Sequence, residues 1–154
     1  MLKLYFKDNK IIWTGILWRL FRDMEKSLVL IKPDGVEQNV IGKILSMYED
    51  NGLKIVSLKM LTVDKEFAMK HYSEHIGKPF FNELINYITR GPLCALVLEG
   101  DDAINKIRKI NGATNPEKAE KGTIRALYGT NLTENCVHAS DSKESAAREI
   151  SLWF

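Results

Sequence analysis

The stretch Leu93-Cys94-Ala95-Leu96-Val97-Leu98 decides the fold of this chain, because it is the clearest apolar run in the sequence. Gly91-Pro92 precedes it, and a short apolar run bounded by turn residues is typical of a strand buried in a sheet. A helix is expected on each side of this strand. The upstream helix begins at Pro79 and carries apolar residues at helical spacing, and the downstream helix begins at Asp101 and continues through Ile107.

Further upstream, the sequence predicts two more strands and two more helices. They are, in order, a strand at Ser27–Ile31, a helix from Val40 to Tyr48, a strand over residues 53–63 and a helix that Asp64 caps. The turn Lys32-Pro33-Asp34-Gly35 ends the first strand, and Asn51-Gly52 ends the first helix.

Downstream of the helix that begins at Asp101, the sequence from Ile110 to about Lys121 predicts a long irregular loop. A structureless loop of this kind inside a compact domain is usually functional or disordered. A short strand is expected around His138, and a last helix begins near Lys143.

Strands that alternate with helices in this order predict an α/β domain of the α+β kind. We expect the ferredoxin-like βαββαβ arrangement, in which helices cover an antiparallel sheet. The chain has 154 residues, a length that suits one domain with one sizeable core. We expect residues 24–154 to form that domain and residues 1–23 to be an extension outside it, because Met24 opens a stretch that resembles a natural start.

The composition excludes several classes of protein. A net charge of +2 is too small to indicate specific nucleic-acid binding through a bulk electrostatic field. Two cysteines, Cys94 and Cys136, do not make a disulfide scaffold, so we expect reduced thiols and a cytoplasmic location.

Residues 1–23 raise the question of a membrane. Their apolar run from Ile11 to Phe21 is interrupted by Thr14, Gly15 and Arg19, and it is shorter than the roughly 20 residues that a span needs. We therefore expect no membrane partner. The alternative is an interfacial amphipathic helix with one apolar face, which would consist of Ile12, Ile16, Leu17, Leu20 and Phe21.

The chemistry of the chain is concentrated in Asn135-Cys136-Val137-His138-Ala139-Ser140-Asp141-Ser142. Neither a Gly-x-x-x-x-Gly-Lys-Ser/Thr loop nor a Gly-x-Gly-x-x-Gly loop is present in the sequence, so any phosphate site must be built from scattered side chains. A hydrolytic triad of His138, Ser140 and Asp141 is an alternative, although these residues are crowded into one turn. His71 and His75 have the i, i+4 spacing of metal ligands, but no third ligand is evident.

The segment around His138 closely resembles the signature Asn-x-x-His-Gly/Ala-Ser-Asp-Ser/Gly of the nucleoside diphosphate kinases. Lys32-Pro33-Asp34-Gly35 after an apolar strand is also typical of that family, and the resemblance extends over nearly all of residues 24–154. The family often has glycine where Ala139 stands, and alanine is also accepted there.

The resemblance implies a role for each of several residues. His138 would be the catalytic nucleophile that carries a pros-phosphohistidine, with Glu149, Ser140 and Tyr72 as its catalytic neighbours. The implied nucleotide-binding residues are Lys32, Phe80, Arg108, Thr114, Arg125 and Asn135. Phe80 would stack on the base, Asn135 would contact the sugar, and Leu132 would form the other face of the base slot.

The resemblance also implies a reaction and its partners. The γ-phosphoryl of ATP would pass to nucleoside and deoxynucleoside diphosphates by a ping-pong route, which maintains nucleoside triphosphate pools. Mg²⁺ would bind through the nucleotide phosphates and not through a cage of protein side chains. Members of the family are tetramers or hexamers of identical chains, so a homo-oligomer is expected. The alternatives are a nucleotide-binding member without catalysis and a membrane-attached form.

Overall fold

The computed structural model describes residues 6–7, 10–11 and 24–154. The first two of these segments, β1 (Phe6–Lys7) and β2 (Lys10–Ile11), pair antiparallel in a separate two-stranded sheet. The amphipathic helix considered for Ile12–Phe21 lies outside the described residues. Among the described residues, no helix has both the length and the apolar character that crossing a bilayer requires.

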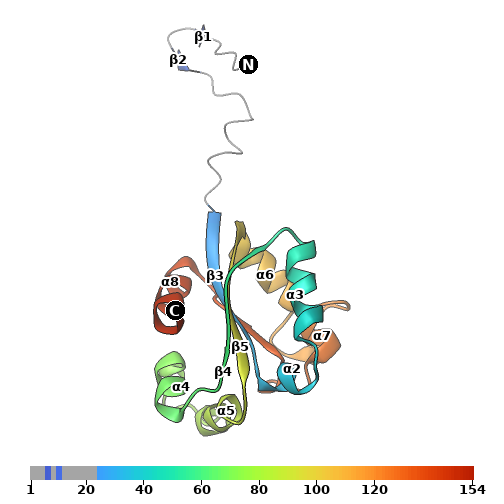
Figure 1. Ribbon diagram of the computed structural model, residues 1–154, viewed down its shortest axis with the longest axis vertical. Helices are drawn as coiled ribbons and strands as arrows, with labels where there is room; N and C mark the ends of the chain where they lie inside the picture. Colours follow the sequence, from blue (N-terminus) through green and yellow to red (C-terminus); the bar gives the residue numbers. More distant parts are fainter. Residues whose placement is uncertain (1–5, 8–9, 12–23) are drawn as a thin grey trace.

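The domain is built on a four-stranded antiparallel sheet with the strand order β4-β5-β3-β6 (Figure 1). The central strands are β3 (Met24–Ile31) and β5 (Leu93–Asp101), and the edge strands are β4 (Lys54–Leu61) and β6 (Val137–Ala139). Every neighbouring pair is antiparallel. This topology confirms the ferredoxin-like arrangement that was expected from the order of strands and helices.

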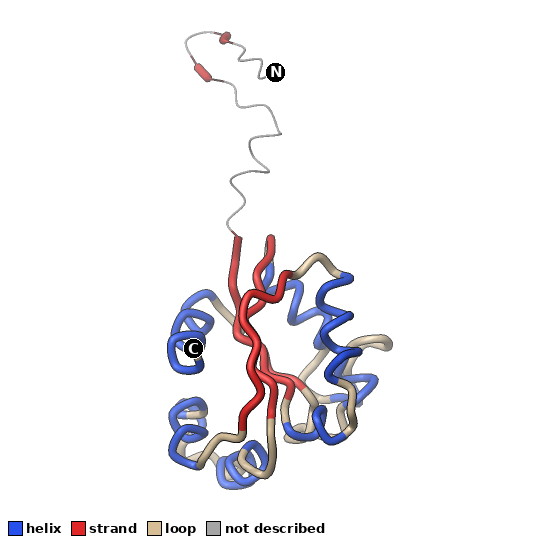
Figure 2. Tube along the Cα trace, viewed as in Figure 1, coloured by secondary structure: helices blue, strands red, loops and turns tan. Residues whose placement is uncertain are grey.

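Helices cover both faces of the sheet, as Figure 2 shows. One face carries α3 (Ile41–Asp50), α6 (Ala103–Asn111) and α7 (Ile124–Tyr128), and the other carries α4 (Lys65–His71), α5 (Phe81–Ile88) and α8 (Lys143–Trp153). Because successive side chains of a strand point to opposite faces, β3 contributes Val29 and Ile31 to one core and Leu28 and Leu30 to the other. This double burial explains why the central strands are continuous apolar runs.

The boundaries of several elements differ from the sequence expectations. Pro33 opens a short helix, α2 (Pro33–Glu37), where a turn was expected. Helix α5 begins at Phe81 and not at Pro79, so Phe80 is its N-cap residue. Asp101 is the last residue of β5, and α6 starts after Asp102, which has a left-handed backbone.

The segment that was expected to be a loop from Ile110 is more structured than the prediction. Helix α6 continues to Asn111, and the connection contains the 3₁₀ turn η2 (Pro116–Lys118) before α7. Helix α7 was not predicted, because a five-residue helix shows no periodicity over several turns. It is held in place by tertiary contacts, since Ile124 is fully buried in the core.

The short edge strand β6 places His138. Leu30 lies opposite His138 in the ladder, and the backbone N–H of Ser140 donates to the carbonyl of Leu28 at 3.1 Å. Val137 and Ala139 face the core under α3 and α6. His138, between them in the strand, therefore faces the opposite side, where α4 and α8 lie.

Candidate active site

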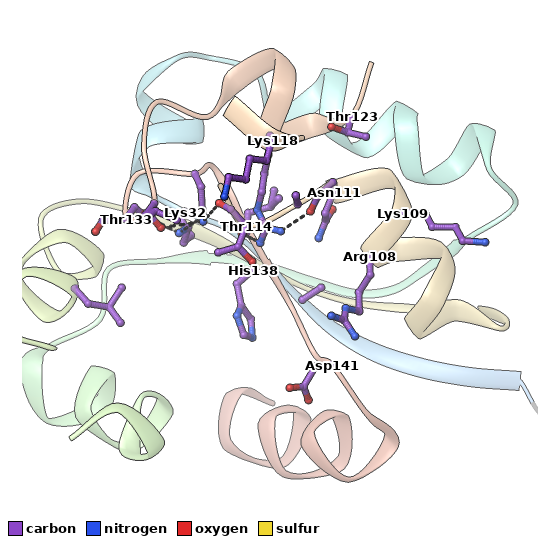
Figure 3. A pocket seen from close by; sticks show the side chains of 18 of the residues that line it. Lys32, Arg108, Lys109, Asn111, Thr114, Lys118, Thr123, Thr133, His138 and Asp141 are labelled. Atoms are coloured by element: carbon purple, nitrogen blue, oxygen red, sulfur yellow. Dashed lines mark hydrogen bonds between the residues drawn. The ribbon is translucent and has the colours of Figure 1, made fainter. Parts of the chain in front are cut away.

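A cleft of about 1230 Å³ opens beside β6 and contains His138. Its walls come from segments far apart in the sequence: the end of β3, the turn after α4, the side of α6, residues 112–123, α7 and the loop of residues 130–135. Figure 3 shows His138 and Arg108 reaching into the same space, whereas Lys109 extends away from the histidine. The cleft is large enough to hold a nucleotide.

The imidazole of His138 is held by a carboxylate. Its Nε2 lies 3.1 Å from Oε1 of Glu149, which projects from α8. Ser140 Oγ donates to Oε2 of the same carboxylate at 2.5 Å and accepts from the backbone N–H of Leu28 at 3.2 Å. The three residues that were predicted to act together are therefore in direct contact, and β3 supports them.

The charge of Glu149 fixes the tautomer of His138. Burial alone would raise the pKa of Glu149, but the hydrogen bond from His138, the electrostatic interaction with that ring and the hydrogen bond from Ser140 outweigh it, so the pKa lies below its ordinary value. A carboxylate only accepts hydrogen bonds, so Nε2 of His138 must carry the hydrogen. In the neutral ring, Nδ1 then has a free lone pair.

His71 lies against His138, a contact that sequence reasoning missed. The centres of the two rings are 4.9 Å apart in an edge-to-face arrangement, and His71 is buried. Burial lowers the pKa of His71 to about 3, so this ring is neutral at ordinary pH. The i, i+4 spacing of His71 and His75 is visible in the sequence. The contact of His71 with His138 is not, because the two residues are more than sixty positions apart.

Ligand atoms of His71, His138 and Glu149 lie within 4.8 Å of one another. The candidate metal ligands in the structure are therefore His71 with these two residues, and not His71 with His75. Trp153 Nε1 donates to Nδ1 of His71 at 3.1 Å, and an indole N–H can only donate. Nε2 of neutral His71 must therefore carry its hydrogen, and it finds no partner among the described residues. A protonated nitrogen does not bind a metal, so this tautomer argues against a metal centre here.

Lys32 is buried at the end of β3 and faces the cleft. Its Nζ donates to the carbonyl of Thr133 at 2.9 Å and to Oδ1 of Asn135 at 2.6 Å. An ammonium group has three hydrogens, so one donor remains for a ligand. Burial lowers the pKa of Lys32 to about 8, although the charge of Asp34 raises it.

Asn135 organises the wall of the cleft. Its Nδ2 donates to the carbonyls of Thr114 and Leu132, both at 3.0 Å, while its Oδ1 accepts from Lys32. Both hydrogens of the amide are therefore used within the protein, and one lone pair of Oδ1 remains for a ligand.

The two arginines that were singled out in the sequence occupy different environments. Arg125 is half-buried in α7 and donates to the carbonyls of Gly112 and Val137, both at 2.8 Å. Its Nε is buried without a partner among the described residues, and burial lowers the pKa of the guanidinium. Arg108 projects from α6 into the cleft (Figure 3), and Thr114 lines the same wall.

Three aromatic or apolar residues, Tyr72, Phe80 and Leu132, also line the cleft. Phe80 is 45% exposed and Leu132 is 63% exposed, which excludes core packing as the role of Phe80. Tyr72 is buried at the C-terminal end of α4 and lines the cleft. Burial and the nearby charge of Glu149 raise the pKa of Tyr72, so its phenol stays protonated and can donate a hydrogen bond.

The geometry excludes the hydrolytic triad. Ser140 is fully buried and donates to Glu149, so its oxygen is not presented to a substrate. Asp141 is exposed, and Ser145 lowers the pKa of its carboxyl group. The cleft is also lined by charged residues that no sequence pattern marked: Glu83, Asp102, Lys109, Lys118 and Glu120.

Residues 25–154 match the family model described as nucleoside diphosphate kinase, which defines the class of the protein as an enzyme of the phosphotransferase type. A curated nucleoside diphosphate kinase from Clostridium perfringens is 68% identical over 131 residues, which is 85% of this chain and 92% of that protein. The chain belongs to the nucleoside diphosphate kinase family.

Solved structures agree with this assignment. The nucleoside diphosphate kinase of Aquifex aeolicus matches with a TM-score of 0.83 and 43% identity over 85% of this chain and 95% of that chain. A halophilic nucleoside diphosphate kinase from Halobacterium salinarum, solved in complex with CDP, matches with a TM-score of 0.83 and 44% identity over 85% of this chain and 88% of that chain.

Proposed function

We propose that this enzyme transfers the γ-phosphoryl group of ATP to nucleoside and deoxynucleoside diphosphates through a phosphohistidine at His138. One observation carries the proposal: Glu149 binds Nε2 of His138, which leaves Nδ1 with a free lone pair in a cleft lined by cationic side chains. The CDP complex of the Halobacterium relative supports a nucleoside diphosphate as ligand.

In the first half-reaction, the lone pair of His138 Nδ1 attacks the γ-phosphorus of ATP. The bond between that phosphorus and the β,γ-bridging oxygen breaks, and ADP leaves with the electron pair. Positive charge develops on the imidazole as the phosphorus–nitrogen bond forms, and the Glu149 carboxylate stabilises it through Nε2–H.

In the second half-reaction, a terminal oxygen of a nucleoside diphosphate attacks the phosphorus on His138. The phosphorus–nitrogen bond breaks, and its electron pair returns to Nδ1. The two half-reactions use the same site in turn, so the mechanism is ping-pong. The overall reaction maintains the pools of nucleoside triphosphates.

The remaining cleft residues position the nucleotide. Lys32, Arg108 and Arg125 neutralise charge on the transferred phosphoryl group, and Thr114 and Tyr72 can each donate a hydrogen bond to it. Phe80 and Leu132 hold the base between them, and the free lone pair of Asn135 Oδ1 accepts from a sugar hydroxyl.

Mg²⁺ fits this site as an ion that arrives with the nucleotide. Mg²⁺ prefers oxygen ligands, whereas the one cluster of ligand groups within the described part of the chain has two histidines and one carboxylate. Bound together with the nucleotide, Mg²⁺ would neutralise part of the charge of its phosphates.

We also propose that the enzyme is a cytoplasmic homo-oligomer, a tetramer or a hexamer. Leu58 and Met60 on edge strand β4 are 49% and 53% exposed in the single chain. Large apolar side chains exposed in this way are typical of a surface that another subunit covers. Cys94 and Cys136 are both free and buried, which suits a reducing compartment. Light scattering after size-exclusion chromatography tests the oligomeric state.

Steady-state kinetics test the proposal. A double-reciprocal plot of rate against ATP, at several fixed GDP concentrations, should give parallel lines, because ADP leaves before GDP binds. Exchange of labelled ADP into ATP should also proceed without a second nucleotide. Intersecting lines, with no such exchange, would indicate direct transfer between two bound nucleotides and would overturn the proposal. ATP binding without turnover would identify a member of the family that only binds nucleotides.

The titration of Lys32 predicts a pH dependence. The free enzyme needs the ammonium form to bind phosphate, and the pKa of Lys32 is about 8, so kcat/KM should decrease as the pH rises through about 8. With Lys32→Arg the side chain stays charged, and this alkaline decrease should disappear even if the rate is lower. A wild-type profile that stays flat to pH 10 would show that Lys32 does not bind the substrate as a cation.

Removal of the proposed base contact should weaken binding more than it slows chemistry. Stacking on an aromatic ring contributes about 1–3 kcal/mol per base, so Phe80→Ala should raise KM for GDP roughly 5- to 150-fold and change kcat little. Met69→Ala, at an exposed apolar residue away from the cleft, is the control. An unchanged KM in Phe80→Ala would mean that the base binds elsewhere.

A further inference from the structure

Arg90, just beyond the end of α5, connects two segments that are far apart in the sequence. Its Nε and one terminal nitrogen, Nη2, donate to the two carboxylate oxygens of Glu37 at 2.9 and 2.7 Å. Its other terminal nitrogen, Nη1, donates to Glu134 at 2.6 Å, and Nη2 also reaches the second oxygen of Glu134 at 3.3 Å. The guanidinium also lies 5.0 Å from the centre of the Tyr87 ring.

Glu134 belongs to the loop of residues 130–135, and its backbone shapes that loop. Its carbonyl accepts from the backbone N–H of Thr130 at 2.7 Å, and its own N–H donates to the side chain of Asn131 at 2.8 Å. The carboxylate that Arg90 holds is therefore attached to a residue whose backbone bonds across the loop. Glu37, at the end of α2, fixes the other side of the arginine to the domain.

The same loop supplies both internal partners of the Lys32 ammonium, the carbonyl of Thr133 and the side chain of Asn135. These residues flank Glu134 in the sequence. Lys32 also lies 5.1 Å from the centre of the Tyr87 ring, the ring that Arg90 contacts. Movement of Glu134 would therefore move the two acceptors that orient the third, free hydrogen of the ammonium.

We propose that Arg90 is a positioning residue for the nucleotide site, because it ties the loop of residues 130–135 to α2 and so orients Lys32 toward a bound phosphate. This inference rests on the proposed function of the cleft. An isolated exposed ion pair stabilises a protein little, but Arg90 holds both carboxylates through two nitrogens each and contacts an aromatic face. The effect is electrostatic at a partly exposed position, so it should weaken at high salt.

The test is the dissociation constant of ADP, measured by calorimetry on the full chain, together with steady-state kinetics. Arg90→Ala should weaken ADP binding about 3- to 10-fold, the scale of one coupled contact, and should raise KM with it. Arg90→Lys keeps the charge but lacks the planar fork, so it should recover only part of the affinity. Lys70→Ala, which breaks a remote exposed pair with Glu66, should leave ADP binding unchanged.

Glu134→Ala separates positioning from a simple effect of charge. Removal of a negative charge near the cleft would by itself tighten the binding of an anionic nucleotide. The positioning account predicts the opposite sign, a roughly 2- to 5-fold weaker binding, because the loop loses its tie to Arg90. Tighter binding in Glu134→Ala would overturn the inference, as would an unchanged ADP affinity in Arg90→Ala.

A double-mutant cycle tests whether Arg90 acts through Lys32. If it does, Arg90→Ala should have almost no further effect on ADP affinity once Lys32 is replaced by methionine. If the loss of ADP affinity in the double variant equals the product of the losses in the two single variants, the inference is contradicted. The proposed function and the role of Arg90 are tested by different measurements. A wild-type chain that binds ADP but transfers no phosphate would contradict the proposed function. The effect of Arg90 on ADP affinity could still be measured in that chain.

Discussion

Replacement of His138 by alanine should lower kcat by about 10⁴-fold or more, because the side chain that accepts the phosphoryl group is absent. The structure predicts that the variant still folds. The His138 side chain is 26% exposed and is not part of either hydrophobic core, so its loss creates no large buried cavity. Lys32 and the two cleft arginines remain in the variant, and ADP should still bind.

Turnover of ATP and GDP by the purified variant measures this effect, with thermal unfolding and ADP binding as controls. A variant that unfolds near the wild-type temperature and binds ADP, but shows no turnover, matches the account. Retention of more than a few per cent of wild-type activity would show that phosphate does not pass through His138.

Replacement of Glu149 by glutamine should lower kcat by about 10²-fold, the scale observed when one charged hydrogen bond to a developing charge is lost. The amide has nearly the same shape, and its oxygen can still accept from Nε2 of His138. It has no negative charge to stabilise the imidazole as the phosphorus–nitrogen bond forms. KM should change little, because Glu149 is buried under His138 and does not line the large cleft.

Glu144→Gln is the matched control for this prediction, since Glu144 is an exposed residue of the same helix, α8. It removes the same charge and should keep wild-type kcat. Nitrogen NMR of His138 provides a second measurement: the wild type should show hydrogen on Nε2, and Glu149→Gln should show a mixture of tautomers. A wild-type ring with its hydrogen on Nδ1 would contradict the assignment of Nδ1 as the nucleophile.

The sequence predicted those features that local patterns encode. The apolar runs of β3 and β5 and the cap at Asp64 are properties of a few adjacent residues, and the structure confirms them. Ser140 lies in the segment around His138, and Glu149 follows on the next helix. Because the three residues are close in the sequence, the contacts between them could be anticipated.

The contacts that fix the cleft join residues that are far apart in the sequence, and no local pattern shows them. Lys32 is bound by residues about a hundred positions away, and Arg90 binds carboxylates from two other segments. Asn135 was expected to meet a sugar, but most of its hydrogen-bonding capacity is used to shape the wall of the site. Such roles depend on tertiary packing.

The phosphohistidine at His138 can be tested by following phosphate on the protein itself. The full chain is mixed with γ-labelled ATP and Mg²⁺, quenched in base, and then chased with GDP, with His138→Ala treated in parallel. The account predicts one label per active site that is stable in alkali and labile in acid, absent from the variant, and transferred to GTP on the chase. Label that persists in His138→Ala, or that does not move to GDP, would contradict a phosphohistidine relay at this residue.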